Sequence, residues 1–179
     1  MAKSTLKIVR TVADLRGQVA AWKAAGERVA LIPTMGALHE GHLSLVQLGQ
    51  ARARRTVASV FVNPKQFAPH EDFDSYPRGE ARDAELLAGA GCDLMFAPGV
   101  EEMYAPGFST TVDLTGVSEP LEGAARPQFF GGVATVVASA WRSPAVSRVT
   151  LAWAWRSAAS SGRGSMEKSR SPCRTSCPS

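Results

Sequence analysis

Short apolar runs and segments with helical spacing alternate along the first 138 residues of the chain. Val29–Ile32, Thr56–Val62 and Asp93–Ala97 are nearly continuous apolar runs, which predicts strands buried on both faces. Because helical segments separate them, we expect an α/β fold with a Rossmann-like, doubly wound parallel sheet covered by helices on both faces. Three helices are expected. The first starts at Thr11–Asp14, which resembles a capping box, and reaches Ala25; the others run from about His42 to Arg54 and from Glu80 to Ala90.

Weaker patterns complete the expected topology. Lys7–Arg10 and Ser109–Leu114 have the composition of extended segments, and Val133–Ala138 is expected to form the first turns of a further helix. Asn63–Arg78, which contains three prolines, and Arg126–Gly132, which contains a glycine pair, are predicted loops.

Residues 139–179 differ in composition from the rest. They contain 11 Ser and 7 Lys+Arg against 1 Asp+Glu, a charge balance of +6, whereas residues 1–138 contain 13 Lys+Arg against 15 Asp+Glu, a balance of −2. The basic excess lies outside the body, so no nucleic-acid partner is expected. Apart from Val146–Trp155 the tail lacks periodicity, which predicts disorder. We therefore divide the chain into a nucleotide-binding domain at 1–138, complete or incomplete, and a Ser/Arg-rich tail at 139–179.

Few features point to a membrane or to disulfides. No apolar run is long enough to cross a bilayer and the first residues lack a secretory core, so a cytoplasmic location without a membrane partner is expected. Cys92, Cys173 and Cys177 do not form a disulfide framework. Cys92 precedes an apolar run and is expected to be an inert, buried thiol.

The segment from Ile32 to His42, Ile-Pro-Thr-Met-Gly-Ala-Leu-His-Glu-Gly-His, carries the strongest chemical signal. It leads from a strand through a glycine turn to a helix start that holds His39 and His42. Helix N-termini attract phosphate, and glycines let a nucleotide approach the backbone. Two imidazoles there can donate to phosphate oxygens and stabilise developing charge. A metal pair or a merely polar helix start is the alternative, but no Cys or third His lies nearby to complete a metal site.

Three blocks of sequence, in order, resemble one family. Pro33–Leu45 reads PTMGALHEGHLSL, Ser59–Arg78 reads SVFVNPKQFAPHEDFDSYPR, and Leu121–Val137 reads LEGAARPQFFGGVATVV. Together they resemble the pantothenate synthetases, within the HxGH nucleotidyltransferases, over about residues 1–138; other nucleotidyltransferases would match only the first block. Another HxGH nucleotidyltransferase, or a remnant that binds nucleotide without turnover, is the alternative interpretation.

The resemblance implies a ligase that forms a C–N amide bond. Family members join (R)-pantoate to ATP, giving pantoyl adenylate and pyrophosphate, and β-alanine then displaces AMP to give pantothenate. ATP is therefore the expected nucleotide substrate, with Mg²⁺ bound mainly through its phosphate oxygens rather than at a protein metal site.

The same resemblance assigns roles to individual residues. Within an ATP-binding segment, His42 resembles the proton donor, and His39 is expected to act beside it on the phosphates. Gln66 resembles the glutamine that binds pantoate close to β-alanine, and Asn63 resembles its neighbour in that pocket. Without the resemblance, Asn63 would be read as a strand-ending turn and Gln66 as a surface polar residue. The ATP-binding segment comprises Met35, Gly36, Ala37, Leu38, His39, Glu40, Gly41 and His42.

Two departures from the family bear on activity. Phe129 stands where the family usually has a His that lines the pantoate pocket, and a phenyl ring cannot hydrogen-bond in this way. After Ser139 the family's Gly-Glu-Lys-Asp segment, its KMSKS-like loop and its carboxy-terminal domain are missing, and no Lys lies between Lys65 and Lys168. We therefore expect weak or no synthetase activity, regard a family-like homodimer as in doubt, and interpret the tail as a frameshifted or truncated reading frame.

Overall fold

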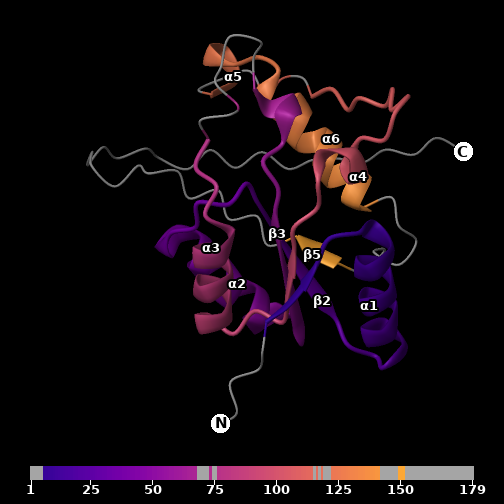
Figure 1. Ribbon diagram of the computed structural model, residues 1–179, viewed down its shortest axis with the longest axis vertical. Helices are drawn as coiled ribbons and strands as arrows, with labels where there is room; N and C mark the ends of the chain where they lie inside the picture. The colour runs from indigo at the N-terminus through magenta and orange to yellow at the C-terminus, as the bar shows by residue number, and fades with distance from the viewer. Residues whose placement is uncertain are drawn as a thin grey trace, which may run out of the picture.

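A parallel sheet forms the centre of the computed structural model, which describes residues 6–67, 73, 76–114, 116, 118, 122–141 and 149–151. All strand pairs are parallel, in the order β1-β4-β3-β2-β5. Figure 1 labels β3, β2 and β5 of this sheet. The expected Rossmann-like α/β sheet is confirmed. The strands are β1 (Lys7–Val9), β2 (Val29–Thr34), β3 (Arg55–Val60), β4 (Leu94–Phe96) and β5 (Val149–Leu151).

Helices cover both faces of this sheet. In Figure 1, α2 and α3 lie on one side of the strands, and α1 and α6 lie on the other. The three helices expected before residue 91 are confirmed, with ends that shift by one or two residues. The helical elements are α1 (Val12–Ala24), α2 (Glu40–Arg52), the 3₁₀ turn η1 (Pro64–Gln66), α3 (Glu80–Gly89), α4 (Val100–Met103), α5 (Glu122–Ala125) and α6 (Phe129–Trp141). None of the described helices is long and apolar enough to cross a membrane.

Three of the weaker expectations need comment. The predicted loop Arg126–Gly132 is wrong in its second half, because α6 already begins at Phe129. Ser109–Leu114 forms no strand; its backbone passes α6, and the N–H of Val112 donates to Oγ1 of Thr135 over 3.0 Å. Most of residues 139–179 lie outside the described residues. The expected disorder of this tail therefore concerns residues that the structure does not describe.

Successive strand residues point to opposite sides, which builds two cores. Val57, Leu94 and Phe96 pack toward α1 in the first core. Ala58 and Met95, from alternate positions, pack toward α2 and α3 in the second. Such burial on both faces explains why the strands read as continuous apolar runs.

Cys92 also lies in the second core, at the start of β4. Its thiol contacts the carbonyl oxygens of Thr56 and Leu94 at 3.5 and 3.4 Å, and burial raises the pKa of the thiol. The expected buried thiol is confirmed, and its raised pKa disfavours the reactive thiolate.

Gly49 sets how closely α2 approaches the sheet. A Cβ at this position would lie 3.2 Å from Cβ of Ala30 and 3.3 Å from Cδ1 of Ile32. Gly17 in α1, by contrast, has no heavy atom within 4 Å of its would-be Cβ.

We predict that Gly49→Val lowers the free energy of unfolding by about 2 kcal/mol through overpacking. Gly17→Ala serves as the control and should raise it by about 0.5–1 kcal/mol through helix propensity. Urea denaturation followed by circular dichroism measures both. A Gly49→Val protein as stable as the wild type would contradict the close packing of α2.

Candidate functional site

The candidate residues leave two neighbouring strands at the same edge of the sheet. Thr34 at the end of β2 pairs with Val60 at the end of β3, and the N–H of Phe61 donates to the carbonyl of Thr34 over 3.1 Å. Met35 follows β2 directly, and Asn63 lies three residues beyond β3. This carboxyl edge is where open parallel sheets bind their ligands.

A tight turn carries the chain from β2 to α2. Gly36 and Ala37 both have positive φ angles, +86° and +51°. A Cβ on Gly36 would lie 3.0 Å from Oδ2 of Asp83 and 3.2 Å from Cγ1 of Val60, so this position requires glycine twice over. Ala37 adopts a conformation that costs an L residue roughly 1 kcal/mol, so surrounding contacts must hold it there.

Asp83 supplies those contacts. Its side chain is only 2% exposed, and its two oxygens accept the N–H groups of Ala37 over 3.0 Å and Leu38 over 2.8 Å. These two N–H groups are therefore used inside the protein and are not free to bind phosphate. Sequence reasoning missed Asp83, because the pattern of Glu80–Ala90 indicates only a helix that covers the sheet. The available signal was a carboxylate four residues before buried Leu87, on the same helix face.

His39 and His42 lie together at the start of α2, with ring centroids 4.1 Å apart. His39 is the N-cap residue, and its Nδ1 accepts the N–H of Gly41 over 3.1 Å. Nδ1 of His42 accepts the N–H of His39 in a longer contact of 3.4 Å. A backbone N–H can only donate, so each neutral ring must carry its proton on Nε2. Both imidazoles thus present an Nε2–H donor.

The environment of His42 favours its neutral form. Burial lowers the pKa of His42 and the neighbouring His39 lowers it further, while the charge of Asp83 acts in the opposite direction. His42 is half-buried and His39 is exposed. At neutral pH, His42 is therefore a neutral hydrogen-bond donor with a fixed tautomer.

Asn63 and Gln66 form the second group of candidates. Asn63 caps η1 and is fully buried, and its Nδ2 donates to Oε1 of Gln66 over 2.9 Å and to the carbonyl of Gly132 over 3.0 Å. Its Oδ1 accepts the N–H of Lys65 over 3.1 Å and the hydroxyl of Tyr104 over 2.8 Å. The structure therefore brings both candidates together, and all the hydrogen-bonding capacity of Asn63 is used within the protein.

Arg126 joins this group from the segment before α6. Its Nη2 donates to the backbone carbonyl of Gln66 over 2.9 Å. Its guanidinium also lies 4.8 Å from the centroid of the Phe129 ring and 5.9 Å from that of Phe67. Phe129 thus packs against the cation beside Gln66.

A cavity of about 260 Å³ opens at the carboxyl ends of β2, β3 and β4. Met35 and Gly36 line it from the turn, Arg78 and Asp83 from the start of α3, and Gly99 from the segment after β4. Two residues of the histidine-bearing motif thus face a cavity at the expected edge. The rings of His39 and His42 are not among its lining residues.

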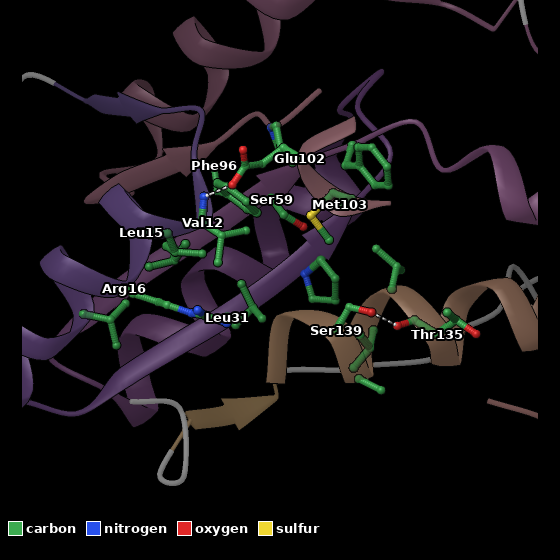
Figure 2. A pocket seen from close by; sticks show the side chains of 18 of the residues that line it. Val12, Leu15, Arg16, Leu31, Ser59, Phe96, Glu102, Met103, Thr135 and Ser139 are labelled. Atoms are coloured by element: carbon green, nitrogen blue, oxygen red, sulfur yellow. Dashed lines mark hydrogen bonds between the residues drawn. The ribbon is translucent and has the colours of Figure 1, made fainter. Parts of the chain in front are cut away.

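A larger cavity of about 400 Å³ lies on the α1 side of the sheet. Figure 2 shows Leu31, Phe96 and Met103 around it, with the hydroxyl of Ser139 donating to the carbonyl of Thr135 within α6. Its lining is mainly apolar and, like that of the smaller cavity, includes neither imidazole. Position at the strand ends, rather than size, therefore favours the smaller cavity as the nucleotide side of the site.

A family comparison agrees with this arrangement. Residues 7–144 match the family model described as pantoate-beta-alanine ligase. The chain belongs to the pantoate-beta-alanine ligase family. The pantothenate synthetase of Caulobacter vibrioides is 78% identical over 131 residues, which are 73% of this chain and 46% of that protein. That of Paramagnetospirillum magneticum is 62% identical over 134 residues, 75% of this chain and 47% of that protein.

Solved structures of the pantoate-beta-alanine ligase family give the same fold. Pantothenate synthetase from Thermus thermophilus matches with a TM-score of 0.67 and 52% identity, over 76% of this chain and 48% of that one. A Francisella tularensis pantoate-beta-alanine ligase, described as complexed with beta-gamma ATP and beta-alanine, matches with a TM-score of 0.66 and 29% identity, over 76% and 52% of the two chains. The chain spans about half the length of the curated relatives it matches.

Asp83→Asn is expected to lower the free energy of unfolding by about 2 kcal/mol, since an amide can satisfy only one of the two turn N–H groups that the carboxylate accepts. Glu80→Gln on the same helix is the matched control. Glu80 forms an exposed ion pair with Arg10, and such pairs contribute little to stability. Chemical denaturation would measure both, and equal effects would refute the proposed hold of Asp83 on the turn.

Acid should weaken the start of α2. The folded-state pKa of His42 lies below its ordinary value of 6.5, so the unfolded chain takes up this proton first as the pH falls. The stability contribution is therefore complete above about pH 6.5 and is lost as the pH falls through the folded-state pKa. His42→Gln keeps a helix-capping side chain but cannot titrate. The stability difference between wild type and His42→Gln should decline below this pH; a constant difference would contradict the assignment.

Proposed function

We propose that this chain forms the ATP-binding part of a ligase that joins pantoate to β-alanine through an acyl adenylate. The pair of Nε2–H donors on His39 and His42, held where a strand leads into a helix, carries this proposal. Membership of the pantoate-beta-alanine ligase family supports the substrates, and the Francisella relative described with beta-gamma ATP and beta-alanine supports the nucleotide. A cytoplasmic location stays a prediction, as does the expectation that the missing carboxy-terminal part puts a family-like homodimer in doubt.

In the first step, a carboxylate oxygen of pantoate attacks the α-phosphorus of ATP, and the bond from that phosphorus to pyrophosphate breaks. His42, as the expected proton donor, and His39 donate through Nε2–H to phosphate oxygens as negative charge develops. The N-terminal end of α2 adds positive potential. A donor of this kind contributes roughly a hundredfold to a thousandfold in rate.

In the second step, the amine of β-alanine attacks the acyl carbon of the adenylate. The C–O bond to AMP breaks, AMP leaves with the electron pair, and the nitrogen loses its extra proton. Gln66 would hold the pantoate end beside this reaction. In the described part of the chain no three His, Cys, Asp or Glu side chains converge on a metal position, so we derive no step through a protein-held metal. Magnesium would arrive on the phosphates of ATP and neutralise part of their charge.

Binding of ATP tests the histidine pair directly. His39→Ser keeps an N-cap and His42→Ala is compatible with the helix, but neither side chain carries a donor that reaches the position of the imidazole Nε2–H. We expect each substitution to weaken ATP binding roughly tenfold, as for the loss of one hydrogen bond to a charged group. His70→Asn, outside the motif, is the control and should bind as the wild type does. Calorimetric titration measures all three; undiminished affinity in both motif variants would exclude the assigned role.

A protein consisting of these 179 residues alone should form pantothenate at less than roughly a hundredth of the rate of the Caulobacter vibrioides relative. The chain has no Lys between Lys65 and Lys168, and Phe129 packs against Arg126, which donates to the carbonyl of Gln66. Coupled detection of AMP with ATP, pantoate and β-alanine measures the rate. A rate like that of the relative would disprove the expected impairment while supporting the ligase assignment.

A further inference from the structure

Two backbone groups fix the orientation of the Asn63 side-chain amide. The N–H of Lys65 can only donate, so the Asn63 atom 3.1 Å away is the oxygen Oδ1. The carbonyl of Gly132 can only accept, so the Asn63 atom 3.0 Å away is the nitrogen Nδ2. Turning the amide over would oppose N–H to N–H and oxygen to oxygen in a fully buried place.

Gln66 takes its orientation from Asn63. The second N–H of Nδ2 lies 2.9 Å from the Gln66 side chain, so the atom it meets there is the acceptor Oε1. The other end of the Gln66 amide, Nε2, therefore presents two N–H donors and no acceptor. Gln66 is only 5% exposed, and within the described residues its Nε2 has no hydrogen-bond partner. Nε2 is not among the fully buried atoms without a partner, so it is open to solvent and available to an acceptor on a ligand.

Arg126 and Tyr104 also contact the Asn63–Gln66 pair. The guanidinium of Arg126 donates to the backbone carbonyl of Gln66 over 2.9 Å and so brings a positive charge to the same residue. Tyr104 acts from the other side of Asn63, where its hydroxyl donates to Oδ1 over 2.8 Å. Burial raises the pKa of Tyr104 to about 12, so the hydroxyl keeps its proton over the working range of pH.

We propose that Asn63 is a positioning residue, which contacts no substrate and instead locks Gln66 as a pure donor that selects a carboxylate. The inference rests on the proposed function, because pantoate is the acid to be selected. The sequence resemblance implies that Asn63 lines the substrate pocket. We instead assign Asn63 the role of fixing the orientation of the Gln66 amide, with its own orientation fixed by the backbone of Lys65 and Gly132.

Asn63→Asp should reverse the orientation of the Gln66 side-chain amide. The new carboxylate still accepts the N–H of Lys65 but can donate neither to Gly132 nor to Gln66. The amide of Gln66 should then turn to donate to it and present Oε1 to the ligand. We expect pantoate binding to weaken roughly tenfold to a hundredfold, and the preference for pantoate over its neutral primary amide to fall. A loss of packing alone would weaken both ligands equally.

A matched control changes an amide to an acid elsewhere. Nε2 of Gln50 donates to the carbonyls of Ala90 and Gly91 over 2.9 and 3.0 Å at an exposed position. Gln50→Glu therefore also loses two backbone partners but should leave the affinity and the preference unchanged. Calorimetry with pantoate and with its amide, and circular dichroism for folding, cover the three proteins.

Nuclear magnetic resonance of the wild type tests the lock without any variant. Both side-chain amide protons of Asn63 should exchange slowly, and the Nε2 protons of Gln66, not those of Asn63, should shift when pantoate is added. Pantoate affinity and preference unaffected by Asn63→Asp, or shifts at Asn63 in place of Gln66, would overturn the proposal. If the wild type binds no pantoate, the proposed function fails and the selecting role of Asn63 fails with it.

Discussion

The buried carboxylate of Asp83 holds the turn on which the candidate site depends. By accepting the N–H groups of Ala37 and Leu38, it ties α3 to the segment that joins β2 to α2. The contact stabilises the left-handed conformation of Ala37, and Asp83 also closely approaches Gly36. Since His39 and His42 begin the next helix, the position of their rings relative to the sheet follows from a side chain about 45 residues away in sequence.

Much of the fold could be predicted from the sequence, because its local and global patterns agree. The runs containing Val57 and Met95 are buried on both faces, and a two-sided parallel sheet is the arrangement that satisfies such runs. The start of α6 could not be predicted in the same way. Gly131 and Gly132 indicate a loop on propensity alone, but both lie within the helix. Glycine is required at 132 because a side chain there would collide with the backbone of Lys65.

The sequence predicted which candidate residues lie together, but not the hydrogen-bond partners that position them. The motif placed His39 beside His42, and the family resemblance placed Asn63 beside Gln66; both pairs are in contact. Their supporting partners come from distant segments, such as Tyr104, and no local spacing in the sequence reveals such contacts. The hydrogen-bond orientation of a side-chain amide likewise depends on which backbone groups it meets, which only the folded chain determines.

The close approach at Gly132 has a mechanical consequence. A Cβ there would lie 2.9 Å from Cγ of Gln66 and would overlap the carbonyl oxygen of Lys65. The backbone of the first turn of α6 therefore packs directly against the backbone of η1. A contact of this kind has little slack, since dense packing transmits displacement rather than absorbing it. Any movement of η1 against this contact would therefore displace the amino end of α6. Because Val136 of α6 packs against the first core, such a displacement would reach the α1 side of the sheet.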